Sequence, residues 1–423
     1  MSCNWPLKRI SEVANFENNK RVPLKSLDRE KRQGDYPYYG ASGIVDYIDD
    51  FIFDGNYLLI SEDGENLRTR NTPIAFQAKG KFWVNNHAHI FSEKEDGILD
   101  YLEYYFSVLN IGAYITGAVQ PKLNKANLDK IEIPIPPLEE RLKLNGVLNS
   151  FRDKSRLNRR INQTLEEMAQ AVFKSWFVDF DPVKAKMNGE QPEGMDAATA
   201  SLFPEKLVES ELELIPEGWE VGTLDSHTSM IIDHRGKTPK KLGSDWVEKG
   251  YPAISAKNIK SKKIVRPDTI RFIDEATYKK WMKEPLIKGD IIMTSEAPMG
   301  ELYFFDGSED FCLSQRLYGL RANSDVCSPE FLFNWLQTKK AKADMEGRAS
   351  GTTALGIKQA ELRKVKILTP PRELLEKYSA VASNLVDMAA KNNAQNTVLE
   401  DLRDTLLPKL LSGEIELAPQ GNQ

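Results

Sequence analysis

The sequence predicts an α+β protein in which two repeated mixed α/β domains are each followed by a long helix. Three observations lead to this prediction. Similar strings recur in the two halves of the chain, at numbering offsets of 214 (219 − 5) and 234 (351 − 117). Within each half, short runs typical of β-strands precede a long stretch rich in Leu, Glu and Arg. Both long stretches carry apolar residues at alternating steps of three and four, which is typical of helices that pair as a coiled coil.

Length and composition set the broad class. A chain of 423 residues and 48.0 kDa is expected to hold two or three domains, at about 100–200 residues each. Hydrophobic residues at 41% and charged residues at 28% predict a soluble globular protein. No stretch reaches the ~18 apolar residues of a membrane span, and the first residues lack the apolar segment of a secretory signal. Three cysteines without zinc-site spacing fit a reducing cytoplasm.

The repeat is visible as aligned strings. Trp5 and Trp219 open the two halves, and GNYLLISE (55–62) matches GDIIMTSE (289–296) at an offset of 234 (289 − 55). At that offset, seven identities fall within the 21 positions from 117 to 137 without a gap, which is hard to obtain by chance. They are Gly117, Ala126, Leu128, Lys130, Ile133, Pro136 and Pro137, which recur as Gly351, Ala360, Leu362, Lys364, Ile367, Pro370 and Pro371.

Each half has the same internal order. Strand-like runs such as YLLIS and HAHIF, or DIIMTS and LYGLR, are separated by Gly, Pro and Asp. A closing strand, KIEIPI (130–135) or KVKILT (364–369), ends at a Pro-Pro pair, after which a helix is expected. The predicted boundaries are a first domain at 1–137, a helical region at 138–181, a linker at 182–215, a second domain at 216–371, and a second helical region with a tail at 372–423.

The two helical stretches carry matching heptads. Steps of three and four from Leu144 to Val172, and from Tyr378 to Leu406, each give seven apolar residues at nine positions. This narrow stripe predicts that the two helices pair with each other, whereas packing inside one globular domain is the alternative. Asn158 and Asn392 occupy the same stripe position, where a buried polar residue would fix the register of a coiled coil.

Charge is unevenly distributed although the net charge is only −5. Residues 1–135 carry 16 basic and 19 acidic groups (−3), whereas residues 216–371 carry 25 and 21 (+4). Two local basic runs, at 20–32 and 235–266, lie within these segments. Such runs suit a phosphate backbone, although solvated loops are the alternative. Arg, Asn and Gln can also read base edges, and the small turns near 117–120 and 350–353 could let the backbone approach DNA. The candidate DNA-binding residues are Lys20, Arg21, Lys25, Arg29, Arg32, Gln120, Arg235, Lys237, Lys240, Lys241, Lys257, Asn258, Lys260, Lys262, Lys263, Thr352 and Thr353.

Catalytic motifs are absent from the sequence. There is no G-x-G-x-x-G, and the stretch GTTALGIK (351–358) departs from a phosphate-binding loop because its Lys is displaced. His87 and His89 could face the same way and hold a metal, but without a convincing third ligand they are interpreted as structural. Asp63 with Gln77 and Lys79 only vaguely resembles a nuclease metal site and has no equivalent in the second half. We therefore expect no active site, no metal and no bound cofactor.

Several strings together give the chain a family resemblance. They are GAVQPKLNKANLDKIEIPIPPLEER (117–141), SWFVDFDPVKAKMNGE (175–190), LIPEGWEVGTL (214–224), YPAISAKNIK (251–260) and LLPKLLSGEIEL (406–417). In combination they resemble the specificity subunit of type I restriction–modification enzymes, over essentially the whole chain. The second half departs from the pattern, since its closing segment lacks the string P-x-P-P-L-x-E.

The resemblance implies two target-recognition domains and two helices packed antiparallel as a coiled coil. Each recognition domain would read one half of a bipartite, asymmetric site in double-stranded DNA. The helices would dock two modification subunits that bind S-adenosylmethionine, while restriction subunits would use ATP and Mg²⁺. It also implies that Trp176, Phe177 and Phe180 form part of the interface with a modification subunit, whereas burial against a neighbouring domain is the alternative.

Two other functions are consistent with parts of the sequence. A nuclease or methyltransferase that works alone would cleave or methylate DNA as the purified chain. A coiled-coil adaptor without DNA contact would show no salt-sensitive binding to a duplex. A specificity subunit of a related system with a bipartite site is a further alternative. The sequence does not reveal the two half-site sequences.

Overall fold

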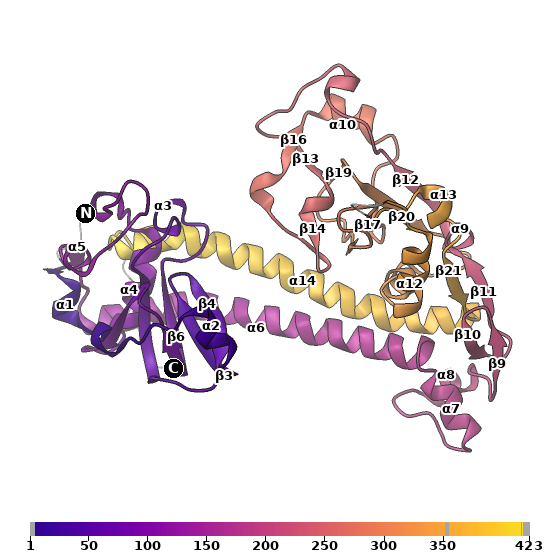
Figure 1. Cartoon of the computed structure of the whole chain (residues 1–423), viewed down its shortest axis with the longest axis horizontal. Coiled ribbons are helices and arrows are strands. Elements are labelled where there is room, and N and C mark those ends of the chain that lie inside the picture. The colour runs from indigo at the N-terminus through magenta and orange to yellow at the C-terminus, as the bar shows by residue number, and fades with distance from the viewer. Residues whose placement is uncertain (1–4, 352–354, 416, 418–423) are drawn as a thin grey trace. The chain divides into compact units, whose positions relative to one another are not determined.

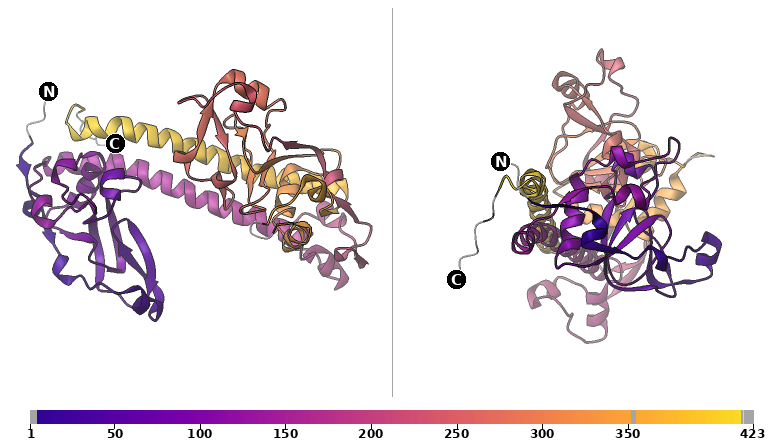
Figure 2. Two further views of the ribbon diagram at one scale, coloured as in Figure 1. Left: turned by 45° about the horizontal axis from the view of Figure 1, so that its top comes forward. Right: turned by 90° about the vertical axis from the view of Figure 1, so that its left-hand side faces the viewer.

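The computed structural model describes residues 5–351, 355–415 and 417. The chain divides into two compact units, which are residues 1–158 with 394–423, and residues 159–393. Two long helices, α6 (Leu138–Phe177) and α14 (Arg372–Leu411), contribute one part to each unit. Both are unbroken in each view (Figures 1 and 2). The units are therefore taken in turn below.

The first unit is built on a six-stranded sheet in the order β2-β7-β5-β6-β3-β4. Neighbouring strands are antiparallel except for the parallel pair β3 and β6. The two short strands β1 and β8 pair separately. The elements before α6 are β1 (Leu7–Lys8), α1 (Ile10–Val13), β2 (Ala14–Phe16), η1 (Asn18–Lys20), α2 (Ser26–Glu30), β3 (Gln33–Gly40), β4 (Gly43–Ile48), β5 (Phe53–Ser61), α3 (Asn66–Thr69), β6 (Ala75–Val84), β7 (Ala88–Glu93), α4 (Ile98–Val108), η2 (Gly112–Tyr114), α5 (Lys125–Leu128) and β8 (Ile133–Pro134).

The core of the first unit joins the sheet to the long helices. Leu58 and Ile60 of β5 pack with Leu99 and Leu102 of α4, and all four are buried. The same cluster takes in Leu144 and Leu148 of α6 together with Leu407, Leu410 and Leu411 of α14. Burial of these side chains fixes parts of both long helices in one hydrophobic core.

A polar network also attaches α4 to α6. Arg152 Nη1 of α6 lies 3.3 Å from a carboxylate oxygen of both Asp100 and Glu103 of α4. Gln77 of β6 donates to the same two carboxylates, at 2.6 and 2.8 Å. Burial raises the pKa of Glu103. Burial opposes ionisation of Asp100 as well, but hydrogen bonds from Gln77 and Asn149 and the charge of Arg152 together hold its pKa below the usual value.

The second unit contains a four-stranded antiparallel sheet in the order β12-β20-β17-β18 and a three-stranded sheet in the order β16-β13-β19. Hairpins β9–β10 and β14–β15 and the pair β11–β21 complete it. Its elements are α7 (Asp181–Met187), α8 (Ala197–Ser201), β9 (Leu207–Ser210), β10 (Glu213–Pro216), β11 (Glu220–Thr223), α9 (Leu224–His227), β12 (Thr228–Asp233), η3 (Lys240–Leu242), β13 (Tyr251–Ile254), η4 (Ala256–Asn258), β14 (Ile259–Lys260), β15 (Lys263–Ile264), η5 (Pro267–Thr269), β16 (Arg271–Ile273), α10 (Glu275–Trp281), β17 (Ile291–Thr294), β18 (Leu302–Phe304), β19 (Cys312–Leu313), β20 (Leu317–Ala322), α11 (Pro329–Trp335), α12 (Lys339–Arg348), α13 (Gln359–Leu362) and β21 (Lys366–Thr369).

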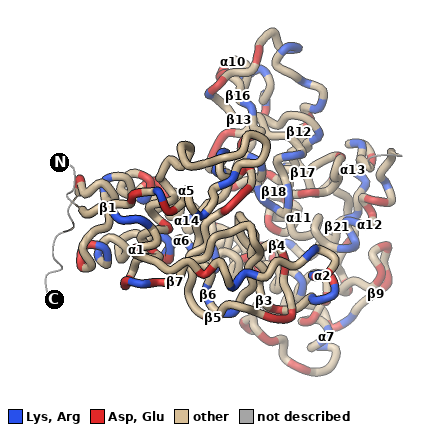
Figure 3. Tube along the Cα trace, turned by 60° about the vertical axis from the view of Figure 1, so that its left-hand side comes forward, with Lys and Arg blue, Asp and Glu red and all other residues tan. Residues whose placement is uncertain are grey.

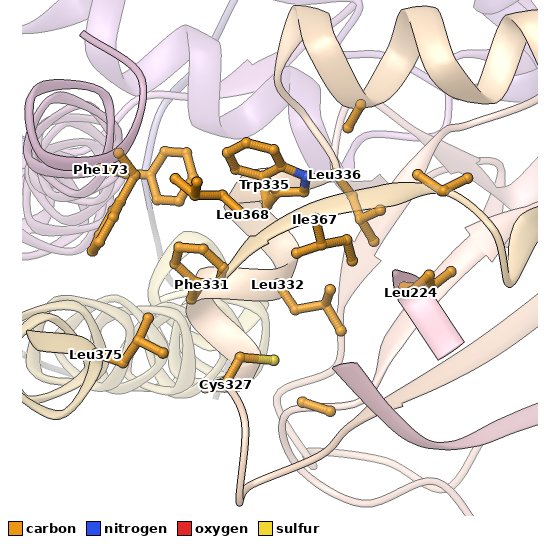
Figure 4. Packing of buried hydrophobic residues seen from close by; sticks show 14 of the residues in the cluster. Phe173, Leu224, Cys327, Phe331, Leu332, Trp335, Leu336, Ile367, Leu368 and Leu375 are labelled. Atoms are coloured by element: carbon orange, nitrogen blue, oxygen red, sulfur yellow. The ribbon is translucent and has the colours of Figure 1, made fainter. Parts of the chain in front are cut away.

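Aromatic residues of α6 are buried in the core of the second unit. Phe173 and Phe177 contact Phe331 of α11 and Tyr378 of α14, with ring centroids 5.0–5.9 Å apart. Figure 4 shows Phe173 beside Phe331, Trp335 and Leu375 in this cluster. The rings supply large apolar areas that tie parts of both long helices to the second unit.

Burial changes the interpretation of the aromatic segment predicted to contact a partner. Trp176, Phe177 and Phe180 are 7%, 0% and 6% exposed and belong to the core of the second unit. Their neighbours include Phe203 and Trp219. The direct partner contact expected for these side chains is therefore not supported. Instead, the alternative of burial against the neighbouring domain matches their position.

The segment 182–215 is more than a spacer between domains. It forms α7, α8 and the hairpin β9–β10. Val183, Phe203, Leu212 and Ile215 are buried in the same core as the aromatic residues of α6. The linker was expected because this segment contains several Pro and Gly residues. In the structure, they separate short elements that pack on the second unit.

Equivalent elements recur at the offsets seen in the sequence. Helices α6 and α14 are both 40 residues long, and their starts differ in numbering by 234 (372 − 138). The short helices α5 and α13 share that offset of 234 (359 − 125), and α1 and α9 have an offset of 214 (224 − 10). The strand that follows each opening tryptophan, β1 or β11, pairs antiparallel with the last strand before the Pro-Pro pair, β8 or β21. The internal repeat is thus a repeat of structure as well as of sequence.

The buried stripe of each long helix departs from the predicted heptads, because two of the nine predicted positions on α6 and four of the nine on α14 are exposed. Lys154 and Met168 of α6 are exposed, whereas Ser155 is buried and Ala169 is partly buried. On α14, Val381, Met388 and Leu402 are exposed in the same way, and Ala382 is buried. At Met168, Val381 and Met388, the steps of three and four fell on the larger residue, and the alanine that follows is more buried. A small buried residue permits a closer approach of neighbouring backbones.

Amide side chains lie in the middle of the buried stripes. In the first unit, Asn158 is fully buried and donates to Gln395 Oε1 at 2.8 Å and to Asn396 Oδ1 at 3.0 Å. In the second unit, Asn392 donates to Asn162 Oδ1 at 2.8 Å. The offset of 234 relates Asn158 to Asn392 and Asn162 to Asn396. The two asparagines singled out in the sequence therefore each bond to a partner asparagine rather than to one another.

The buried aromatic residues give a test of the core. Phe177→Ala should lower the free energy of unfolding of the second unit by about 3–5 kcal/mol, because the cavity would lie in a fully buried cluster. Urea unfolding followed by tryptophan fluorescence measures this. Glu167→Ala, at an exposed position of the same helix, should change stability by less than about 0.5 kcal/mol. A small effect of Phe177→Ala would contradict the burial described above.

The network around Arg152 predicts a pH-dependent effect. Arg152→Met should destabilise the first unit by about 2–3 kcal/mol at pH 7, because Asp100 and Glu103 lose their counter-ion. Because folding lowers the pKa of Asp100, its ionised form stabilises the fold at pH values above the ordinary pKa of an Asp side chain. That stability is lost as the pH falls below the ordinary pKa. The difference between variant and parent should therefore shrink in urea titrations at about pH 3, which lies below the ordinary Asp pKa of 3.8. Arg156→Met, an exposed residue one turn further along α6, is the control and should be nearly neutral at both pH values.

Candidate nucleic-acid interface

The basic run of the first unit is largely engaged in contacts within that unit. Arg21 is mostly buried and donates to Glu62 Oε2 at 2.7 Å and to two backbone carbonyls of the β6–β7 connection. Arg29 and Arg32 pair with Asp46 and Asp49. These two guanidinium groups also lie over the rings of Tyr38 and Trp83. Arg21, Arg29 and Arg32 therefore hold the loop before β3 in place, with little of their charge free for DNA.

Lys20 and Lys25 differ from these arginines. Lys20 pairs with Glu17 at 2.8 Å, while half of its side chain stays exposed. The Glu17 carboxylate raises the pKa of Lys20. Lys25 is exposed, with no ion-pair partner in the described part of the chain. Of the predicted basic residues in this unit, Lys25 has the most accessible charge.

The second basic run begins with a similar local arrangement. Arg235 forms a two-pronged pair with Asp233 at 2.8 and 2.9 Å and lies over the ring of Tyr318. The hydrogen bond and charge of Asp233 raise the pKa of Arg235. Lys237 and Lys241 donate to backbone carbonyls of Trp281 and Gly236. Lys240 is exposed without such a partner among the described residues.

The hairpin β14–β15 and the turn before it carry the largest accessible positive charge of the predicted set. Lys257, Lys260 and Lys263 are exposed and have no ion-pair partner within the described ranges. Lys262 at the hairpin tip pairs with Glu166 of α6. Along the described trace, basic and acidic positions are interspersed (Figure 3). Three of the predicted lysines thus remain available to neutralise phosphates.

Asn258 was predicted to read bases, but its position excludes that role in this structure. The side chain is 0% exposed. Its Oδ1 accepts from the backbone N–H of Ser255, and its Nδ2 donates to the carbonyls of Val265 and Arg266 and to Thr269 Oγ1. Asn258 therefore fixes the base of the β14–β15 hairpin and has no donor left for a base edge.

The predicted turn of the first unit is closed by isolated bridges from Lys122 to Thr116 and Asp63. Gly117 has φ +87°, and a Cβ there would lie 2.2 Å from the Gln120 carbonyl oxygen, so the turn requires glycine. Gln120 is exposed, which leaves its amide accessible. Thr352 and Thr353 lie outside the described residues.

His89 lies in β7 and His87 lies just before it, and the two side chains have different surroundings. His89 is buried, with Nδ1 2.9 Å from Asn18 Nδ2 and Nε2 2.8 Å from the carbonyl oxygen of Leu123. Burial lowers the pKa of His89. His87 is about half exposed, and its Nδ1 lies 2.9 Å from both carboxylate oxygens of Asp63. Within the described ranges, no group of three or more His, Cys, Asp or Glu side chains could hold a metal ion.

A comparable exposed pair occurs in the second unit. Arg316 Nε lies 3.0 Å from Glu296 Oε1, and both side chains are well exposed. The sequence interpretation overlooked Arg316 and took His87 as a structural residue after weighing it as a metal ligand, because neither belongs to a basic run. An alignment that matches the start of β7 with the start of β20 would have placed His87 opposite Arg316.

In the described part of the chain, no helix is long and apolar enough to cross a membrane.

The family comparison matches the chain twice. The type I restriction modification DNA specificity domain matches residues 3–167 and again residues 216–400. Two matched segments of this length define a tandem DNA-recognition protein. The chain belongs to the family of type I restriction–modification specificity subunits, which are non-catalytic and recognise DNA.

Relatives and a solved structure agree with this assignment. The chain is 28% identical over 335 residues to the HindI specificity subunit of Haemophilus influenzae, covering 70% of this chain and 71% of that one. It is 24% identical over 433 residues to the MjaIX specificity subunit of Methanocaldococcus jannaschii, covering 98% and 94%. The crystal structure of a type I S subunit from M. genitalium has a similar fold, with TM-score 0.58, 15% identity and 96% coverage of both chains.

The accessible lysines predict how binding responds to salt. Changing Lys257, Lys260 and Lys263 together to Gln should reduce the slope of log affinity against log salt by up to about 3, since each phosphate contact contributes about 0.9. Affinity for a nonspecific duplex at several salt concentrations measures the slope. Lys377, Lys391 and Lys409, three exposed lysines of α14, serve as the matched control triple. Equal slopes for the two triple variants would place the hairpin away from DNA.

Proposed function

We propose that this chain recognises a bipartite, asymmetric DNA site, with one recognition domain for each half. The observation that carries this proposal is the structural repeat: each unit has its own sheets, and in each a short helix, α5 or α13, precedes a closing strand that pairs with β1 or β11. The family match to both segments supports it. The domain boundaries that we propose are those expected from the sequence, with recognition domains at 1–137 and 216–371, helical regions at 138–181 and 372–423, and the segment 182–215 between them.

The two long helices would pair as an antiparallel coiled coil and set the spacing between half-sites. Their equal length supports this, as do the amide contacts of Asn158 and Asn392. In a coiled coil, such buried amides would fix the register. The 28 residues from Leu144 to Val172 span about 42 Å at 1.5 Å per residue. That length corresponds to about 12 base pairs, so the half-site centres would lie roughly 10–13 base pairs apart.

Partner subunits would supply the chemistry. The helices would dock two modification subunits that carry S-adenosylmethionine, and restriction subunits would use ATP and Mg²⁺, all in the cytoplasm. Exposed apolar residues on the long helices favour such docking. They include Leu157 and Val398 in the first unit and Met168, Val381 and Met388 in the second. Because Trp176, Phe177 and Phe180 are buried, these exposed residues replace them as the proposed contacts.

The test is to map methylated sites in cells that carry this chain with its modification subunit. A single split motif, with two defined halves and a nonspecific spacer, is the expected outcome. Methylation without a split motif would rule out bipartite recognition. If the purified chain cleaves or methylates DNA alone, an independent enzyme is the better description. Absence of salt-sensitive duplex binding would favour the coiled-coil adaptor.

Insertion of one heptad at equivalent positions of α6 and α14 tests the proposed role in spacing. The insertion keeps the buried stripe in phase and adds about 10 Å to the helices. We expect a spacer about three base pairs longer with both half-site sequences unchanged, as read by methylome mapping. Rotation about the duplex could lower the overall efficiency. If the variant modifies the parental site with the parental spacer at full efficiency, the helices do not determine the spacing.

A further inference from the structure

A contact between an exposed basic side chain and a carboxylate occurs at equivalent positions in the two units. His87 precedes β7 in the first unit, and Arg316 precedes β20 in the second. Their partners, Asp63 and Glu296, lie just beyond β5 and β17. In each unit, a basic side chain that precedes one strand therefore meets an acidic side chain that follows the neighbouring strand.

Strand pairing establishes that these positions correspond. Ser61 pairs with Ala88 in the first unit, and Thr294 pairs with Leu317 in the second. The next hydrogen bond also matches, from Glu62 N to the His87 carbonyl at 2.8 Å and from Ser295 N to the Arg316 carbonyl at 2.9 Å. His87 and Arg316 are thus equivalent by register, although their side chains differ.

Each pair also borders two bridged residues that precede the closing helix and strand. Asp63 forms an isolated bridge with Lys122, and Glu296 forms one with Gly356. Those two residues bridge in turn to Thr116 and Ser350. Strand register and these bridges therefore match Glu296 with Asp63, one position from the match with Glu62 that the aligned strings give. A basic side chain, an acidic side chain and a bridged residue that a glycine follows are brought together in both units.

Stability alone gives a weak reason for these pairs. The side chains of His87 and Arg316 are 47% and 53% exposed, and exposed ion pairs contribute about 0–1 kcal/mol. Arg316 also has φ +64°, in the left-handed region that a non-glycine residue rarely adopts. Strained residues of this kind concentrate at functional sites. An exposed, strained and oriented arginine fits a recognition role better than a structural one.

Each of the two basic side chains has at least one nitrogen atom that its carboxylate partner does not engage. Glu296 engages Nε of Arg316, and within the described residues Nη1 and Nη2 have no hydrogen-bond partner. Two parallel N–H groups are what bidentate recognition of guanine O6 and N7 requires. In the first unit, the tautomer in which Nδ1–H of His87 donates to Asp63 has Nε2 as an acceptor. Such an acceptor suits the exocyclic amine of adenine or cytosine.

We propose that Arg316 and His87 are specificity-determining residues, one for each half-site, oriented by Glu296 and Asp63. Arg316 reads a guanine, and His87 reads a base with an exocyclic amine in the other half-site. The two halves of the chain use one structural position with different side chains, which gives an asymmetric site from a repeated fold. This inference rests on the proposed function, since it names the reading residues within it.

The experiment compares methylomes of the parent chain, Arg316→Ala, Arg316→Lys, His87→Ala and Glu296→Gln, each with the modification subunit. Arg316→Ala should relax one G·C position in one half-site, by about tenfold or more in discrimination, and leave the other half-site intact. Arg316→Lys should relax the same position, because lysine keeps the charge but lacks the fork. Glu296→Gln should weaken discrimination there to a smaller extent. His87→Ala should alter only the other half-site.

Arg372→Ala is the matched control, because Arg372 is an exposed arginine of the same unit that pairs with Glu376; its motif should be unchanged. If Arg316→Lys and His87→Ala both retain every position of the parental motif, the inference is wrong. Arg316→Lys also decides the matter should Arg316→Ala fail to fold. A parent chain without any split motif would instead contradict the proposed function.

Discussion

Burial of the long helices against the two α/β folds is the interaction on which the rest of the structure depends. Both helices are rich in charged residues, and an isolated helix of this kind gains little from propensity alone. In the first unit, Leu144 and Leu148 share a core with α4 and β5. In the second, Phe173 and Phe177 share a core with α11 and Tyr378. These contacts hold each sheet beside the helices and so orient its loops.

The two units make this attachment with different chemistry. In the first, α6 presents Arg141, Asn145, Asn149 and Arg152, which bond to the carboxylates and backbone of α4 and the loop before it. At the offset of 234 in numbering, α14 presents Leu375, Ser379, Ser383 and Val386. There the attachment depends mainly on Leu375, Tyr378 and Phe331. A polar attachment constrains orientation through hydrogen-bond geometry, whereas the aromatic one constrains it through shape.

The sequence predicted the architecture well because its strongest signals are local or repeated. The Pro-Pro pairs at 136–137 and 370–371 mark the helix starts, and α6 and α14 begin at the next residue. The heptads were only partly correct, since some of their positions are exposed. Only packing decides that Ala382 is buried and Val381 exposed. The steps of three and four alone pointed to the wrong residue of that pair.

The candidate site was less predictable because charge in a sequence says nothing of its partners. Arg21 and Arg29 belong to a basic run, yet carboxylates distant in the sequence engage both. Asn258 is polar and flanked by lysines, yet it is fully buried as the fixed base of a hairpin. Conversely, Arg316 stands alone in the sequence and becomes conspicuous only through its exposed pair with Glu296.

Repetition resolves part of this difficulty, because two diverged copies of one fold act as controls for each other. Where both copies bury a position, packing explains it; Ile60 of β5 and Met293 of β17 are such core positions. Where both pair an exposed basic side chain with a carboxylate but change the side chains, packing of the basic residue gives no reason for the pair to persist. His87 with Asp63 and Arg316 with Glu296 fit that second description. A protein that reads two different sequences with one repeated fold must vary the exposed residues while preserving the frame that orients them.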